Sequence, residues 1–136
     1  MKKVLIVDDD KVFSKVLADT LIGEKFMVVE ASNGQEGLTI FEKERPDLVV
    51  LDVRMPALDG IGFLKKLREK NNNITPVPVL IASNLSDMDK VGEGVSLGVR
   101  GYISKTEETT EGIVADIKRI IDEEERKKKR EGMKKV

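Results

Sequence analysis

Short apolar runs alternate along this chain with stretches in which apolar residues recur at helical spacing. Five of the runs have the length and composition of strands, and a helical pattern follows each of them. Parallel strands joined through helices need right-handed crossovers, so strict alternation predicts an α/β fold, a doubly wound parallel sheet with helices on both faces. The predicted strands are residues 3–7, 26–30, 48–51, 77–82 and 100–103.

Five helical patterns complete this arrangement. The fourth is the weakest, because Gly92 and Gly94 each cost about 1 kcal/mol relative to alanine inside a helix. The fifth has an apolar stripe that ends at Ile121, before the basic residues of the C-terminus. The predicted helices are residues 11–24, a stretch between the turn signal Asn33-Gly34 and Pro46, a stretch opened by Asp59-Gly60, residues 87–97, and residues 107 to about 130.

Length and composition indicate one domain that is large enough to bury a core. The 136 residues include no cysteine and no histidine, which excludes disulfides, thiolate catalysis, zinc sites and imidazole acid–base chemistry. No apolar stretch is long enough for membrane insertion, and the N-terminus lacks a signal-peptide pattern, so we expect a cytoplasmic protein. Residues 126–136 hold seven basic residues against one glutamate, and we predict a domain at 1–125 followed by a basic helix end or tail.

Acidic residues stand directly after two of the predicted strands. Asp8, Asp9 and Asp10 follow the first strand, and Asp52 follows the third. The carboxyl ends of parallel strands meet at one edge of a sheet, where open α/β folds hold their ligands. A carboxylate cluster without histidine or cysteine suits a hard cation such as Mg²⁺. The sequence therefore predicts a magnesium site at this edge.

Four elements, each at the end of a predicted strand, resemble the receiver domain of bacterial two-component response regulators, and the resemblance covers nearly the whole chain. Asp8 and Asp9 resemble the acidic pair after the first strand, and residues 52–60, DVRMPALDG, match the segment D-x-x-M-P-x-x-D-G. Ser83 resembles the hydroxyl residue of the fourth strand, and Lys105 the lysine of the fifth. The resemblance implies the flavodoxin-like strand order 2-1-3-4-5 and a stand-alone, chemotaxis-regulator-like receiver.

By this resemblance, Asp52 is the residue that accepts a phosphoryl group. An aspartate carboxylate can attack phosphorus and form an acyl phosphate. The resemblance implies Mg²⁺ held by Asp9, Asp52 and the backbone carbonyl of Arg54, with Asp8 acting through water. It also implies a phosphohistidine donor on a sensor histidine kinase or a phosphotransfer protein.

Three further residues are implied to act on the phosphoryl group or to respond to it. Lys105 would place positive charge beside one phosphoryl oxygen, and Ser83 would donate a hydrogen bond to another. Tyr102 would rotate inward when Ser83 moves toward the phosphate. Taken alone, Ser83 would be a helix cap and Lys105 a solvated surface residue, and only their register with the other motifs assigns them. Asp10 is expected to be the N-cap of the first helix.

Three positions depart from the family's usual pattern. Thr106 stands where a proline is usual, Asn84 where a small residue is usual, and Arg54 lies two positions after the phosphoacceptor. These residues bear, in that order, on loop geometry, on access to the phosphate and on how fast water hydrolyses the phosphoaspartate.

Two other classes of protein fit parts of the sequence. Residues 8–12, DDDKV, match the D-x-D-x-[T/V] pattern of haloacid-dehalogenase-like phosphatases, with Asp8 as nucleophile and Asp10 as general acid and base. That alternative lacks a later acidic pair for its metal site and leaves residues 52–60 unexplained. A nucleic-acid binder would rest on the basic tail alone, because the chain has neither a helix-turn-helix module nor stacking aromatics.

We expect a receiver that catalyses its own phosphorylation and dephosphorylation and turns over no separate substrate, so it is not an enzyme in the ordinary sense. Its output would be a change in the binding of a downstream protein target, and we do not expect nucleic acid as a partner. We expect a monomer, or a weak dimer that forms on phosphorylation.

Overall fold

The strands form one parallel sheet in the order β2-β1-β3-β4-β5. The structure is a computed structural model that describes residues 1–53, 59–70, 77–84 and 98–134. The order and direction of the strands confirm the predicted flavodoxin-like sheet. The strands are β1 (Lys3–Val7), β2 (Met27–Ala31), β3 (Leu48–Leu51), β4 (Val79–Ser83) and β5 (Gly101–Ser104).

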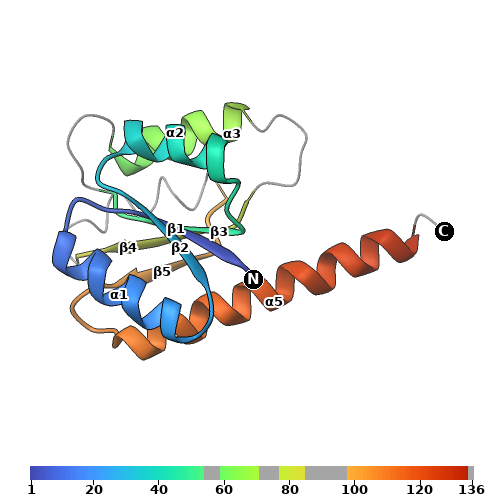
Figure 1. Cartoon of the computed structure of the whole chain (residues 1–136). Helices are drawn as coiled ribbons and strands as arrows, with labels where there is room; N and C mark the ends of the chain where they lie inside the picture. Colours follow the sequence, from blue (N-terminus) through green and yellow to red (C-terminus); the bar gives the residue numbers. More distant parts are fainter. Residues whose placement is uncertain (54–58, 71–76, 85–97, 135–136) are drawn as a thin grey trace.

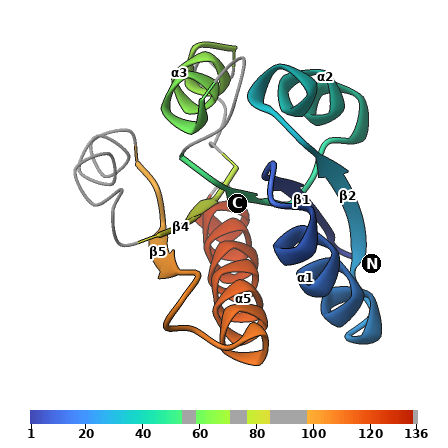
Figure 2. The same ribbon diagram turned by 90° about the vertical axis from the view of Figure 1, so that its left-hand side faces the viewer.

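Helices cover both faces of the sheet. Helices α1 (Lys11–Gly23) and α5 (Thr110–Lys134) lie on one face, and α2 (Gly34–Glu44) and α3 (Gly60–Lys70) lie on the other (Figures 1 and 2). This two-sided layering confirms the doubly wound arrangement. The predicted helix at residues 87–97 lies outside the described residues. No helix in the described part of the chain is long and apolar enough to cross a membrane.

The central strands are apolar at every position because both of their faces are covered. All four residues of β3 are buried, as are the last four of β1. One core lies between the sheet and the helices α1 and α5, and it includes the apolar stripe of α5 from Ile113 to Ile121. A second core between the sheet and α2 with α3 is built around Phe63 and Leu64, both fully buried. Strand β4 begins after Pro78, later than predicted, because proline has no N–H to donate to a neighbouring strand.

Two helices begin with side-chain caps that place the preceding loops. The carboxylate of Asp10 accepts a hydrogen bond from the backbone N–H of Phe13 at 3.1 Å, which confirms Asp10 as the N-cap of α1. Asn33, interpreted from sequence as part of a turn, is the N-cap of α2 and accepts from the N–H of Glu36 at 2.8 Å. These caps fix where the chain leaves the carboxyl ends of β1 and β2.

Helix α5 continues past the last buried residue of its apolar stripe, Ile121, and projects from the body (Figure 1). Its acidic segment is tied to the body rather than to the basic residues that follow. Lys2 Nζ lies 2.6 Å from Glu125 Oε1, and Arg100 pairs with both Glu123 and Glu124. The part of the helix beyond Glu125 is exposed up to residue 132.

We expect removal of residues 126–136 to leave the fold intact. The shortened chain keeps the buried stripe and the ion pair between Lys2 and Glu125. Its thermal midpoint should stay within about 2 °C of the full chain, since exposed polar positions contribute little to stability.

A matched truncation after Lys118 should behave differently because it also removes Ile120 and Ile121, which are 1% and 6% exposed. Loss of these two side chains should lower the free energy of unfolding by roughly 4 kcal/mol. Circular dichroism melts of the two shortened chains test both expectations. Equal melting of the two would show that the stripe does not anchor the helix.

Candidate metal and phosphoacceptor site

Carboxylates from the ends of β1 and β3 meet at the carboxyl edge of the sheet. The backbone N–H of Asp8 donates to the carbonyl of Ala31 at 3.0 Å, and that of Asp52 donates to the carbonyl of Val7 at 2.9 Å. These bonds extend the strand ladders by one residue and hold both aspartates in place. Carboxylate oxygens of Asp8, Asp9 and Asp52 lie within 4.8 Å of one another. The structure thus brings together three of the four acidic residues that the sequence places at this edge, and the fourth, Asp10, caps α1.

Lys105 joins two of these carboxylates. Its Nζ lies 2.7 Å from Oδ2 of Asp8 and 3.4 Å from Oδ2 of Asp52. The backbone N–H of Lys105 donates to the carbonyl of Ser83 at 3.0 Å, so the ends of β5 and β4 position it together. Sequence reasoning expected Lys105 near a phosphoryl oxygen and did not identify its contact with Asp8.

Phe13 also belongs to the surroundings of Lys105, a role that was not predicted from the sequence. The ammonium group lies 4.7 Å from the centre of the Phe13 ring, a cation–π contact. The sequence feature that could have indicated this contact is the position of Phe13 in the first turn of α1, the helix that follows the acidic residues 8–10. A residue there must lie close to the carboxyl edge of the sheet.

Burial dominates the electrostatics of Asp8. The residue is 3% exposed, and burial raises the pKa of its carboxyl group to about 7, against the opposing effect of Lys105. The nearby charge of Asp52 raises that pKa further, while the N–H of Asp10, 2.9 Å from Oδ1, lowers it. For Lys105, burial lowers the pKa, but the carboxylates of Asp8, Asp52 and Asp10 outweigh burial and the pKa is raised. The ammonium therefore stays charged beside carboxylates that repel one another.

The donor set fits Mg²⁺. All three side chains offer oxygen, which is the ligand type that this hard cation prefers. Asp9 is exposed whereas Asp8 and Asp52 are buried, so a cation here would keep access to water on the side of Asp9. Mg²⁺ usually retains several water ligands and uses only one or two carboxylates. The predicted backbone ligand, the carbonyl of Arg54, lies outside the described residues.

Ser83 and Tyr102 lie on the same face of the sheet, on neighbouring strands. In the register of β4 and β5, Ile81 is opposite Tyr102 and Ser83 is opposite Ser104. Ser83 is fully buried. The hydroxyl groups of Ser83 and Tyr102 are buried, and neither has a hydrogen-bond partner in the part of the chain that the structure describes. A buried hydroxyl without a partner can donate to a group that arrives at the site.

Asp59 and Gly60 of the D-x-x-M-P-x-x-D-G segment have structural roles. Asp59 accepts a hydrogen bond from the N–H of Gly62 at 2.8 Å and so caps α3. The N–H of Gly60 donates to the carbonyl of Val53 at 3.2 Å, which brings the start of α3 against the end of β3. A Cβ at Gly60 would contact the backbone carbonyl of Asp52. The motif therefore includes a close approach of two backbone segments beside Asp52.

The two departures from the usual pattern that lie in the described residues are on the surface. Asn84 and Thr106 are both exposed. The Thr106 hydroxyl lies 3.1 Å from the hydroxyl of Ser104, within hydrogen-bonding distance. Arg54 again falls outside the described residues.

Comparison with known proteins identifies the family of this chain. The sequence profile of the family described as response regulator receiver domain matches residues 4–118. The chain belongs to this family. Receiver domains bind Mg²⁺ at an acidic pocket and interact with histidine kinases or phosphotransfer proteins and with downstream targets. The membership confirms the sequence-based assignment and gives no support to the haloacid-dehalogenase alternative.

Two relatives show the range of proteins in which such a domain occurs. The probable transcriptional regulator ycf27 of Cyanophora paradoxa is 39% identical over 104 residues, which make up 76% of this chain and 42% of that protein. Sporulation initiation phosphotransferase F of Bacillus subtilis is 36% identical over 104 residues, 76% of this chain and 82% of that protein. This receiver thus spans about two fifths of the length of relatives such as ycf27.

Solved structures show the same fold. Chemotaxis protein CheY4 of Vibrio cholerae aligns with a TM-score of 0.78 at 29% identity, covering 88% of this chain and 98% of the other. A CheY-like receiver domain protein of Methanospirillum hungatei aligns with a TM-score of 0.84 at 24% identity, covering 93% and 98%, and supports the fold alone.

Proposed function

We propose that this receiver accepts a phosphoryl group on Asp52 and thereby changes which protein it binds. One observation carries the proposal most directly. The carboxylate of Asp52 is at the end of the central strand, in a cluster with Asp8 and Asp9 and 3.4 Å from Lys105 Nζ. A nucleophilic carboxylate that is flanked by a metal-binding acid pair and a cation has the charges that phosphoryl transfer requires.

The proposed reaction is in-line displacement at phosphorus. A carboxylate oxygen of Asp52 forms the new O–P bond, and the N–P bond of a phosphohistidine on a histidine kinase or phosphotransfer protein breaks, so that the histidine leaves as neutral imidazole after it takes up a proton. Lys105 then shifts from the carboxylate to a phosphoryl oxygen, while its contact with Asp8 keeps it oriented. Bound Mg²⁺ supplies positive charge to offset repulsion between the carboxylate and the incoming phosphoryl group.

Water completes the cycle by hydrolysing the phosphoaspartate, so the domain resets itself and turns over no separate substrate. We place this cycle in the cytoplasm, as expected for a receiver that takes its phosphoryl group from a kinase. The chain spans 42% of the ycf27 relative from Cyanophora paradoxa, so the proposed function is that of a receiver domain alone.

Intact mass spectrometry tests the proposal. After incubation with acetyl phosphate and Mg²⁺, the chain should gain one phosphoryl group that hydroxylamine removes, as expected for an acyl phosphate. A chain that gains no mass, or gains a modification stable to hydroxylamine, would contradict the proposal.

Asp9→Ala should remove the stabilisation by Mg²⁺. At a concentration about tenfold above its dissociation constant, Mg²⁺ should raise the thermal midpoint of the wild type by roughly 5 °C, because ligands stabilise the folded state to which they bind. Asp19→Ala is the matched control, since it removes another exposed acid that lies in α1 and outside the cluster. Thermal melts with and without Mg²⁺ should show the shift in the wild type and in Asp19→Ala. An equal shift in Asp9→Ala would rule out Asp9 as a ligand.

Ser83→Ala should leave the fold intact but weaken the response to phosphorylation. Burial of an unpaired hydroxyl costs about 1–3 kcal/mol, so the alanine variant should be at least as stable as the wild type. Without this hydroxyl, the phosphate loses one donor, and residue 83 has no group to move toward the phosphate, so phosphorylation no longer changes the space beside Tyr102 on the neighbouring strand. Amide NMR spectra with and without beryllofluoride should therefore show smaller shifts in residues 98–105.

Ser104→Ala provides the comparison for this experiment, because Ser104 is opposite Ser83 in the sheet and its hydroxyl pairs with Thr106 instead. It should respond like the wild type. If Ser83→Ala responds as strongly as Ser104→Ala, the proposed movement of Ser83 is wrong.

A further inference from the structure

A basic pocket lies at the opposite edge of the sheet from the phosphoacceptor. Its lining includes Val77 and Pro78, which precede β4, and Gly98 and Arg100, which precede β5. In a parallel sheet, residues before the strands and residues after them are at opposite edges, so this pocket is separate from the carboxylate cluster. Its volume is about 490 Å³, within the range of roughly 300–1,000 Å³ that is typical of small-molecule sites.

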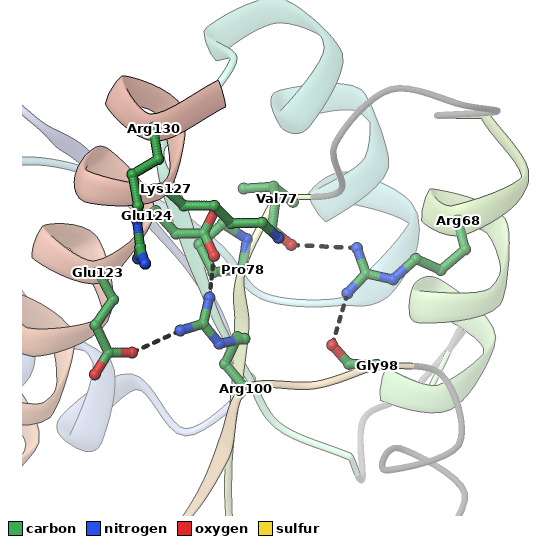
Figure 3. Close-up of a pocket in the computed structure, with 9 residues that line it drawn as sticks. All are labelled: Arg68, Val77, Pro78, Gly98, Arg100, Glu123, Glu124, Lys127 and Arg130. Atoms are coloured by element: carbon green, nitrogen blue, oxygen red, sulfur yellow. Dashed lines mark hydrogen bonds and ion pairs between the residues drawn. The ribbon is translucent and has the colours of Figure 1, made fainter. Parts of the chain in front are cut away.

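Four cationic side chains from three elements surround this pocket. Arg68 comes from α3, Arg100 from the residue before β5, and Lys127 and Arg130 from α5 (Figure 3). Arg68 is half-buried and donates to the carbonyls of Val77 at 3.2 Å and Gly98 at 3.5 Å. Burial lowers the pKa of the Arg68 side chain. The ordinary pKa of a guanidinium is so high that the group nevertheless remains charged.

The acidic residues of the pocket are both engaged by one of these cations. Glu123 lies 2.7 Å from Arg100, and Glu124 also pairs with Arg100. Glu125, the next acid along the helix, is bound to Lys2. The three acids that precede this turn of α5 are therefore tied to the body. Within the described residues, Lys127 and Arg130 form no ion pair, so the pocket keeps two cations that no described carboxylate neutralises.

We infer that this pocket binds a phosphorylated small molecule of nucleotide size. The Lys127 ammonium and the Arg130 guanidinium, about one turn apart on α5, can bind neighbouring oxygens of a phosphate chain. A carboxylate would use fewer of these donors. Val77 and Pro78 form an apolar part of the wall, against which the non-phosphate part of the ligand can lie. The pocket is concave and joins residues that are distant in sequence, unlike the exposed face of a solvated helix.

The experiment is calorimetric titration of the full chain with ADP, with EDTA present and at about 0.15 M salt. Without Mg²⁺ or a phosphoryl donor, the carboxylate cluster repels an anionic ligand. We expect saturable binding at one site with a dissociation constant below about 1 mM. Inorganic pyrophosphate should bind more weakly than ADP, and adenosine should not bind. Absence of ADP binding, or equal affinity for pyrophosphate and ADP, would overturn the inference.

Two double variants of the same helix provide the decisive control. Lys127→Ala with Arg130→Ala should weaken ADP binding by about tenfold or more, since two charged contacts are lost. Lys128→Ala with Lys129→Ala removes the same charge from positions that do not line the pocket, and binding should change by no more than about twofold. Equal weakening in both would mean that ADP associates with the basic helix generally, and the pocket assignment would be wrong.

Neither double variant should alter acetyl-phosphate labelling of Asp52, because the pocket is at the other edge of the sheet. Amide NMR spectra show where on the protein ADP binds. ADP should shift the signals of Val77, Gly98 and Arg100, which line the pocket, while Asp8 and Asp52 stay unshifted. Shifts confined to the carboxylate cluster would contradict the inference.

Discussion

Asp52→Asn should gain no phosphoryl group from acetyl phosphate under conditions that label the wild type completely. The substituted amide keeps the size of the side chain, which is 9% exposed, but it is not a nucleophile toward phosphorus. It also removes one of the three carboxylates from the cluster. Intact mass spectrometry over the same time course measures the difference directly, and the expected effect is complete loss.

Asp10→Asn is the matched control for this variant. Asp10 caps α1 through its contact with the N–H of Phe13, and asparagine caps helices as well as aspartate does. The variant should fold and become labelled as the wild type does. The same comparison tests the haloacid-dehalogenase alternative, which requires Asp10 as general acid and base. Labelling of Asp52→Asn, or its loss in Asp10→Asn, would contradict the assignment of Asp52.

The parts of the fold that follow from local pattern could be predicted from the sequence. Alternating strands and helices, with a fully apolar third strand, led directly to the parallel sheet that the structure shows. The order of the strands came from the resemblance, because alternation alone allows other doubly wound orders. Because the ends of the first and third strands were placed correctly, the meeting of Asp8, Asp9 and Asp52 at one edge could also be predicted.

The contacts of Lys105 could not be predicted in the same way. In the sheet, β4 lies between β5 and β3, and both β3 and β4 lie between β5 and β1. The segment after β5 must therefore extend back across the sheet to bring Lys105 to Asp8. Neither the periodicity nor the spacing of residues in the sequence predicts the conformation of this loop. The pairing of Arg100 with Glu123 and Glu124 was missed for a related reason. In the sequence these glutamates are the natural i,i+4 partners of the basic residues that follow, and only the packed structure pairs them with Arg100, the residue before β5.

The glycine of the D-x-x-M-P-x-x-D-G segment illustrates a motif position whose cause is visible only in three dimensions. A Cβ built on Gly60 would contact the carbonyl oxygen of Asp52 and lie 2.6 Å from the Cα of Val53. Both obstacles are backbone atoms, which cannot rotate away as a side chain would. Glycine is therefore required by close approach at this position.

Gly60→Ala should destabilise the chain by roughly 3 kcal/mol, the upper part of the range for overpacking a close-packed site. Relief of the contact would require the start of α3 to move away from Asp52, which also displaces the phosphoacceptor. At temperatures where the variant remains folded, we expect labelling by acetyl phosphate to slow by about tenfold, since small misplacements of a reacting group are costly. Denaturant unfolding and timed mass spectrometry measure the two effects separately.

Gly132→Ala gives the opposite expectation with the same change of side chain. Nothing lies within 4 Å of a Cβ at this position in α5, so alanine should stabilise the helix by about 0.5–1 kcal/mol at most and leave labelling unchanged. The contrast separates steric contact at Gly60 from any general effect of replacing glycine in a helix. If Gly60→Ala unfolds at the wild-type denaturant concentration and is labelled at the wild-type rate, then α3 is not packed against Asp52 in solution, and the close approach is not what the motif requires.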